Sequence, residues 1–138
     1  MTMPAARPRT AKTAKRAGAA FETETAQYLE LMGLHGAYRR HTSGAVDKGD
    51  VAILGMPEFL AECKYVPKLS LGYAFTETEA EAKNASAEWP VLVHKRHGKG
   101  QPQDQWVTTD LETLANILLT IHNLRQDLAY YQRLVAGK

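Results

Sequence analysis

The spacing of apolar residues predicts several helical segments. Phe21, Tyr28 and Met32 recur at roughly helical spacing. A later stretch is rich in Ala, Glu and Lys, which favour helices, and Thr76 is its expected N-cap because Glu79 follows three residues on. Asp110 is the expected cap of a helix near the C-terminus, and an apolar stripe follows it. The predicted helical segments are residues 19–32, 76–87, 111–118 and 121–135.

Short apolar runs bounded by Gly, Pro and polar turn residues predict strands between these helices. The expected strands are residues 37–42, 51–54, 59–65, 91–95 and 106–109. With the two adjacent C-terminal helical segments counted together, helices and strands follow one another in the order αβββαββα. This order predicts a mixed α/β fold built around a central sheet.

Composition is that of one globular domain. The chain has 138 residues, of which 44% are hydrophobic, enough to form a core. No apolar run approaches the ~18 residues that would span a membrane, and no secretory signal is evident. Cys63 is the single cysteine, so no internal disulfide can form. We therefore expect a soluble cytoplasmic protein that does not bind membranes.

Positive charge is concentrated at the N-terminus. Five basic residues precede the first acidic one, Glu22, although the net charge of the whole chain is only +2. Residues 1–17 also lack apolar periodicity, so we expect a flexible basic arm, followed by a domain at 18–120 and a C-terminal helix at 121–138. Such an arm can hold a phosphate backbone, and it can equally be a solubilising terminus.

Three residues in the middle of the chain suggest chemistry. Glu62 and Lys64 are two apart in a predicted strand, so both side chains leave the same face of the sheet. Asp50 begins the preceding strand and can approach Glu62 if the strands pair. Neighbouring carboxylates repel unless a cation lies between them, and oxygen ligands suit Mg²⁺ or Mn²⁺. A Glu-x-Lys triplet alone is also compatible with a simple ion pair.

These residues belong to a longer series of motifs. Residues 18–118 resemble the restriction-endonuclease-like PD-(D/E)xK nucleases, and most of all the archaeal and phage-type Holliday junction resolvases. The matching pieces are Gly18-x-x-Phe21-Glu22, Tyr28-Leu29, Gly33, Arg39-Arg40, Ser43-Gly44, Asp47-Lys48-Gly49-Asp50-Val51, Ala61-Glu62-Cys63-Lys64 and Pro90-Val91-Leu92-Val93. Gly49 stands where the family usually has proline.

The resemblance implies a fold, an activity and a set of site residues. The implied fold is a restriction-endonuclease-like αβββαβ core with a central mixed sheet, followed by a C-terminal helix. The implied activity is Mg²⁺-dependent cleavage of branched DNA by a homodimer, with a phage or prophage origin. Glu22, Asp50 and Glu62 would bind the metal, and Lys64 would serve catalysis. Glu24 stays an alternative to Glu22, and Asp47 is a turn residue or a spare carboxylate.

Further residues are candidates for contact with DNA. His94 to Lys99 form a basic cluster after a strand, and the family has a serine-glycine loop near the junction. The expected DNA-binding residues are Arg39, Arg40, Ser43, Lys95, Arg96 and Lys99. The stripe from Ile121 to Leu134 can pack on its own domain or on a second copy. A dimer would suit a four-way junction, which presents two related phosphates.

Other functions compatible with these residues stay open. One is a different nuclease of the same fold that cuts flaps, ends or restriction sites. Another is a protein that binds DNA without cutting it. A third is an RNA-processing nuclease.

Overall fold

The computed structural model describes residues 10–41 and 46–138, and the chain divides into two compact units between Thr108 and Thr109. The first unit contains α1 (Ala11–Leu31), β1 (Ala37–Arg39), β2 (Val51–Ile53), β3 (Phe59–Lys64), α2 (Leu71–Asn84), β4 (Trp89–His94), the 3₁₀ turn η1 (Pro102–Asp104) and β5 (Trp106–Thr108). The second unit consists of α3 (Leu111–Ala136). This order of helices and strands confirms the predicted αβββαββα succession.

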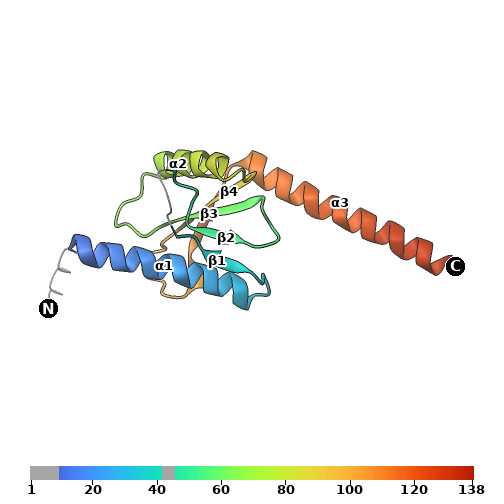
Figure 1. Cartoon of the computed structure of the whole chain (residues 1–138), viewed down its shortest axis with the longest axis horizontal. Coiled ribbons are helices and arrows are strands. Elements are labelled where there is room, and N and C mark those ends of the chain that lie inside the picture. Colours follow the sequence, from blue (N-terminus) through green and yellow to red (C-terminus); the bar gives the residue numbers. More distant parts are fainter. Residues whose placement is uncertain (1–9, 42–45) are drawn as a thin grey trace. The chain divides into compact units, whose positions relative to one another are not determined.

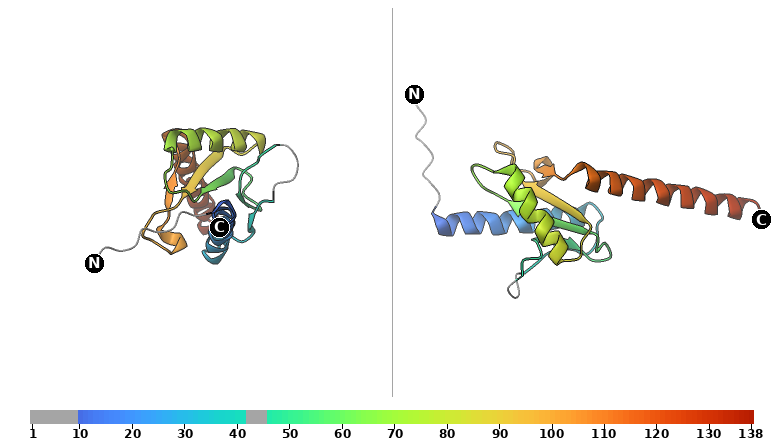
Figure 2. Two further views of the ribbon diagram at one scale, coloured as in Figure 1. Left: turned by 90° about the vertical axis from the view of Figure 1, so that its left-hand side faces the viewer. Right: turned by 90° about the horizontal axis from the view of Figure 1, so that it is seen from above.

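The strands form one mixed sheet in the order β1-β2-β3-β4-β5. Strands β3 and β4 are parallel, because α2 connects them, and the other three pairs are antiparallel. Within the first unit, α1 and α2 cover opposite faces of the sheet (Figures 1 and 2). The molecule is therefore an α/β protein with a five-stranded mixed sheet and a C-terminal helix.

Successive residues of β3 face the two different helices. Ala61 and Cys63 are buried in a core cluster with Phe21 of α1, and the ring of Phe21 meets that of Tyr65 edge-on at 5.6 Å. Glu62 lies on the other face, where it meets α2. The alternation predicted from the sequence is thus confirmed, and it separates an apolar layer from a layer of charged groups.

Helix α1 begins at Ala11, eight residues before the predicted start. Residues 11–17, expected to belong to a flexible arm, are therefore helical. Ala, Lys and Arg are good helix formers, and Thr10 caps the helix by accepting a 3.2 Å hydrogen bond from the Thr13 amide. The expectation of flexibility for residues 1–9 lies outside the described residues.

Helix α2 begins at Leu71 rather than at residue 76, so the prediction that Thr76 caps it is wrong. Thr76 is inside the helix, and its hydroxyl donates a 2.9 Å hydrogen bond to the Gly72 carbonyl one turn earlier. Ser70 occupies the N-cap position. This start was hard to predict from the sequence, because Gly72 and Tyr73 have low intrinsic helix propensities.

Helix α3 runs unbroken from Leu111 to Ala136, so the predicted boundary between residues 120 and 121 falls inside a helix. The expected cap is confirmed, since Asp110 accepts a 2.8 Å hydrogen bond from the Thr113 amide. No helix among residues 10–41 and 46–138 is long and apolar enough to cross a membrane.

Apolar residues of α3 alternate at spacings of three and four, the heptad pattern of coiled coils. Most of their side chains are exposed, among them Leu124 at 62% and Leu128 at 58%. The heptad positions are Leu114, Ile117, Ile121, Leu124, Leu128, Tyr131 and Val135.

Candidate functional site

Antiparallel pairing of β2 with β3 brings Asp50 to Glu62. Val51 is paired with Ala61, and the Asp50 amide donates to the Ala61 carbonyl at 3.0 Å. The Asp50 side chain is fixed in turn, because its Oδ2 accepts a 2.8 Å hydrogen bond from the Cys63 amide. Two carboxyl groups that are twelve positions apart in the sequence therefore lie side by side at the sheet.

Gly49 permits this approach. Its φ is +87°, a left-handed conformation that favours glycine, and a Cβ at this position would lie 2.5 Å from a methyl carbon of Leu60. Proline cannot adopt that φ. The local backbone of this chain therefore requires glycine at position 49, where the family that the sequence resembles usually has proline.

The carboxyl groups of Asp50 and Glu62 both have raised pKa values when no metal ion is bound. Burial raises the pKa of Asp50 to about 8, and the neighbouring charge of Glu62 adds to the shift. Burial likewise raises the pKa of Glu62 to about 9, helped by the adjacent Glu81 carboxyl. One oxygen of Glu62 is buried without a hydrogen-bond partner. Such a group is destabilising unless something binds it, typically by about 1–3 kcal/mol.

Lys64 lies next to Glu62 on the same face of β3. Its Nζ is 3.5 Å from Glu62 Oε1 and 3.4 Å from Glu77 Oε2 of α2. Burial alone would lower the pKa of Lys64, but the two carboxylates outweigh it and raise the pKa above its ordinary value. Lys64 is therefore a fixed cation held between two carboxylates, and it can donate hydrogen bonds to an anion or a water.

Helix α2 contributes carboxylates that the sequence reasoning missed. Glu77 contacts Lys64, and Glu81 is 8% exposed, with one oxygen lacking a partner. Burial raises the pKa of Glu81 to about 7. A signal was present in the sequence, because Glu81 shares a helix face with the small residues Ala74 and Thr78, both of which are buried.

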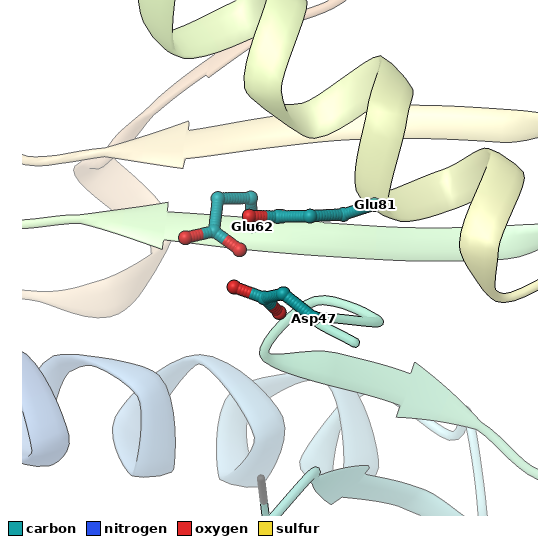
Figure 3. A group of neighbouring side chains, drawn as sticks. All are labelled: Asp47, Glu62 and Glu81. Carbon is teal, nitrogen blue, oxygen red and sulfur yellow. The ribbon is translucent and has the colours of Figure 1, made fainter. Parts of the chain in front are cut away.

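Asp47, Glu62 and Glu81 form a group that could hold a metal ion. One carboxylate oxygen from each lies within 4.8 Å of the others, and the three side chains point toward a common region (Figure 3). Asp47 was predicted to be a turn residue or a spare carboxylate, and it has both features. Its Oδ1 accepts a 2.9 Å hydrogen bond from the Gly49 amide, as in an Asx turn.

Glu22 is held by an ion pair. Its Oε2 accepts a 2.6 Å hydrogen bond from Arg39 Nε of β1. The charge of Glu22 also contributes to raising the pKa of Asp50, so the helix-one carboxylate is near the site. Arg39, a predicted DNA contact, is thus engaged with Glu22 within the molecule.

The other predicted DNA-binding residues fall into two groups. Arg40 lines a cleft of about 350 Å³ together with Arg39, Asp47 and Lys48, the last of which was not among the predicted DNA contacts. The prediction for Ser43 lies outside the described residues.

The second group of basic residues follows β4. Lys95 Nζ donates to the Lys99 carbonyl at 2.6 Å, and the Arg96 guanidinium lies over the Trp106 ring, 4.2 Å from its centroid. The loop therefore positions Arg96 by stacking and Lys95 by a hydrogen bond to the backbone of Lys99.

Comparisons of the chain with protein-family models, with curated proteins and with solved structures each gave no match. What the site can do therefore follows from its own residues: the paired carboxyls of Asp50 and Glu62, the adjacent Lys64 ammonium and nearby basic groups.

Proposed function

We propose that this chain is a divalent-metal-dependent DNA endonuclease that hydrolyses phosphodiesters in branched DNA, with the four-way Holliday junction as its preferred substrate. The observation that carries the proposal is the pairing of the half-buried Asp50 carboxyl with the buried Glu62 carboxyl, with the Lys64 ammonium 3.5 Å from Glu62. The αβββαβ order and the mixed sheet agree with a restriction-endonuclease-like core, which we propose for this domain.

The residues present fit a hard divalent cation. Asp50 and Glu62 offer oxygen ligands, and the unpartnered Glu62 oxygen is a buried acceptor that a cation would satisfy. Glu22 supports the same region through its charge. A bound Mg²⁺ or Mn²⁺ supplies Lewis-acid stabilisation of phosphate oxygens and lowers the pKa of a coordinated water.

Lys64 has the properties needed to orient a water molecule toward the phosphorus. It remains protonated, and two carboxylates restrict its position. It therefore acts as a hydrogen-bond donor and a counter-charge for the developing negative charge, rather than as a general base. Arg40, Lys95, Arg96 and Lys99 supply positive charge for backbone phosphates, which favours recognition of DNA shape over base sequence.

Substrate choice is tested with matched four-way junction, flap and linear duplex DNA in Mg²⁺. We expect the four-way junction to be cut fastest, with paired nicks and little dependence on base identity near the cut. Faster cleavage of the flap or of duplex ends would agree with the proposal of a nuclease but would contradict the proposal of a Holliday junction resolvase.

We also propose that α3 forms a coiled coil with α3 of a second copy. Three consecutive heptads of apolar side chains, most of them exposed, match a partner helix with the same repeat. A twofold dimer would provide one catalytic centre for each of two related phosphates in a junction.

Charged substitutions on the heptad face test this assembly. The double variant Leu124→Glu/Leu128→Glu is expected to convert a dimer to a monomer in light scattering coupled to size exclusion, and to replace paired nicks by single ones. Asn123→Glu/Gln126→Glu adds the same charge off the heptad face and should remain dimeric. A monomeric wild type, or a dimeric Leu124→Glu/Leu128→Glu variant, would contradict the coiled coil.

A further inference from the structure

One row of paired residues crosses three strands at the end of the sheet where Lys64 lies. Lys64 of β3 is paired with His94 of β4, and His94 is paired with Trp106 of β5. Directly paired residues project from the same face of a sheet, so Trp106 shares the face of Lys64. Val107, the next residue of β5, lines a cavity with Tyr28 of α1 on the other face, as this alternation requires. Because neighbouring strands are about 4.8 Å apart, the backbones of Lys64 and Trp106 are about 10 Å apart.

The indole of Trp106 is an exposed aromatic surface next to a planar cation. Trp106 is 49% exposed, and the Arg96 guanidinium lies over its ring at 4.2 Å from the centroid. Burial of so large a side chain is strongly favourable, and in Trp106 about half of that burial is still open to a binding partner. Nucleobases stack both on aromatic rings and on arginine planes. The pair therefore offers the kind of surface on which an unpaired base stacks.

The side chain of Gln105 fixes the loop that contains Arg96. Gln105 Oε1 accepts a 2.8 Å hydrogen bond from the Arg96 amide, and Nε2 donates to the carbonyls of Lys99 and Gln101 at 3.0 and 2.8 Å. Gln105 also directly precedes Trp106 in the chain, so one residue links the loop to the strand that holds the ring. A surface ordered in this way loses little conformational entropy when it binds a ligand.

The basic side chains of the same loop have charge available for phosphates. None of the ion pairs among residues 10–41 and 46–138 involves Lys95, Arg96 or Lys99. An apolar partner would not need these charges, and a duplex backbone alone would not need the exposed ring. An aromatic surface combined with positive charge is the arrangement with which proteins bind single-stranded nucleic acid.

We propose that Trp106 and Arg96 form a stacking platform for one unpaired base of the DNA substrate, with Lys95 and Lys99 as contacts for the adjacent phosphates. This inference rests on the proposed function and narrows its substrate to DNA in which a base is unstacked close to the cut. The separation of about 10 Å between the platform and Lys64 corresponds to about three base steps of a B-form strand. The unpaired base therefore lies within a few nucleotides of the phosphate that Lys64 serves.

Binding of single-stranded DNA in EDTA tests the platform without a metal ion and without cleavage. The probes are an oligothymidylate and an abasic strand of the same length, which has the same phosphates but no bases. We expect the wild type to bind the oligothymidylate about tenfold more tightly, since stacking of one base contributes affinity of that order. Trp106→Ala should bind both strands equally, with the salt dependence of its affinity unchanged, because the phosphate contacts remain. Trp106→Phe should keep most of the preference for bases.

Two further variants separate stacking from charge and from exposure. Arg96→Lys keeps the charge and loses the planar group, so it should weaken the preference for bases. Tyr130→Ala removes an aromatic side chain of similar exposure, 52%, from α3 and should leave the preference intact. A wild type without the preference, or a folded Trp106→Ala that retains it, would overturn the platform.

Junction cleavage in Mg²⁺, measured separately on the wild type, tells the two proposals apart. Cleavage by a protein that binds both strands equally would reject only the platform. A preference for bases that depends on Trp106, in a protein that does not cut, would reject only the nuclease.

Discussion

Replacing Lys64 with alanine is expected to reduce junction cleavage about 10²–10³-fold, the usual loss when one donor to developing charge is removed. The reason is local: the ammonium is held between Glu62 and Glu77, at 3.5 and 3.4 Å. Single-turnover cleavage in Mg²⁺ measures the chemical step. Junction affinity, measured in Ca²⁺, should change little, because Lys64 is one cation among many.

Lys68→Ala is the matched control, since it removes the same side chain from an exposed position four residues on. Its cleavage rate should stay within about twofold of the wild type, because surface substitutions rarely matter. An unchanged cleavage rate in Lys64→Ala would show that Lys64 has no role in catalysis. A parallel loss of rate and of affinity would instead make Lys64 a DNA contact.

The metal-free protein is expected to lose stability as the pH rises from 5 to 8.5. Asp50, Glu62 and Glu81 have folded-state pKa values of about 8, 9 and 7, all raised mainly by burial. Between their ordinary values near 4 and these raised values, the folded state binds more protons than the unfolded state. The free energy of unfolding therefore falls with increasing pH across that window.

The melting temperature in EDTA should accordingly fall by roughly 10 °C over this range, since about 2 kcal/mol shifts a small domain by that much. Burial lowers the pKa of His94, so this group opposes the trend, but only below its ordinary pKa of about 6.5. Excess Mg²⁺ or Mn²⁺ should restore stability at high pH, because the ion binds the deprotonated carboxylates. Glu62→Gln should flatten the EDTA curve by removing the shared carboxyl. A melting temperature that rises with pH in EDTA would contradict the raised pKa values.

The sequence predicted those features that depend on local periodicity. The two-residue period of β3 placed Glu62 and Lys64 on one face and Cys63 on the other, and the structure confirms this. The succession of helices and strands also follows from apolar runs and breakers. Helix starts were less predictable, because Gly72 and Tyr73 adopt the helix through packing of its buried face rather than by propensity.

Contacts between distant elements were beyond the reach of the sequence pattern. The Glu22–Arg39 ion pair depends on α1 lying against β1, and the meeting of Glu81 with Glu62 depends on where α2 crosses β3. A single chain carries no signal for such pairs apart from a charged residue on a buried face, as at Glu81. Candidate ligands could be named from residue type and spacing, but their grouping around Glu62 required the fold.

Cleavage of a synthetic four-way junction, with the wild type compared with Glu62→Gln in Mg²⁺ and in EDTA, tests the central claim most directly. The account predicts symmetrically paired nicks from the wild type in Mg²⁺ alone, and none from Glu62→Gln, which loses a ligand and keeps the fold. A wild-type protein that binds the junction tightly but cuts it in neither Mg²⁺ nor Mn²⁺ would contradict the proposal of a nuclease. Such a result would indicate a protein that binds DNA without cutting it.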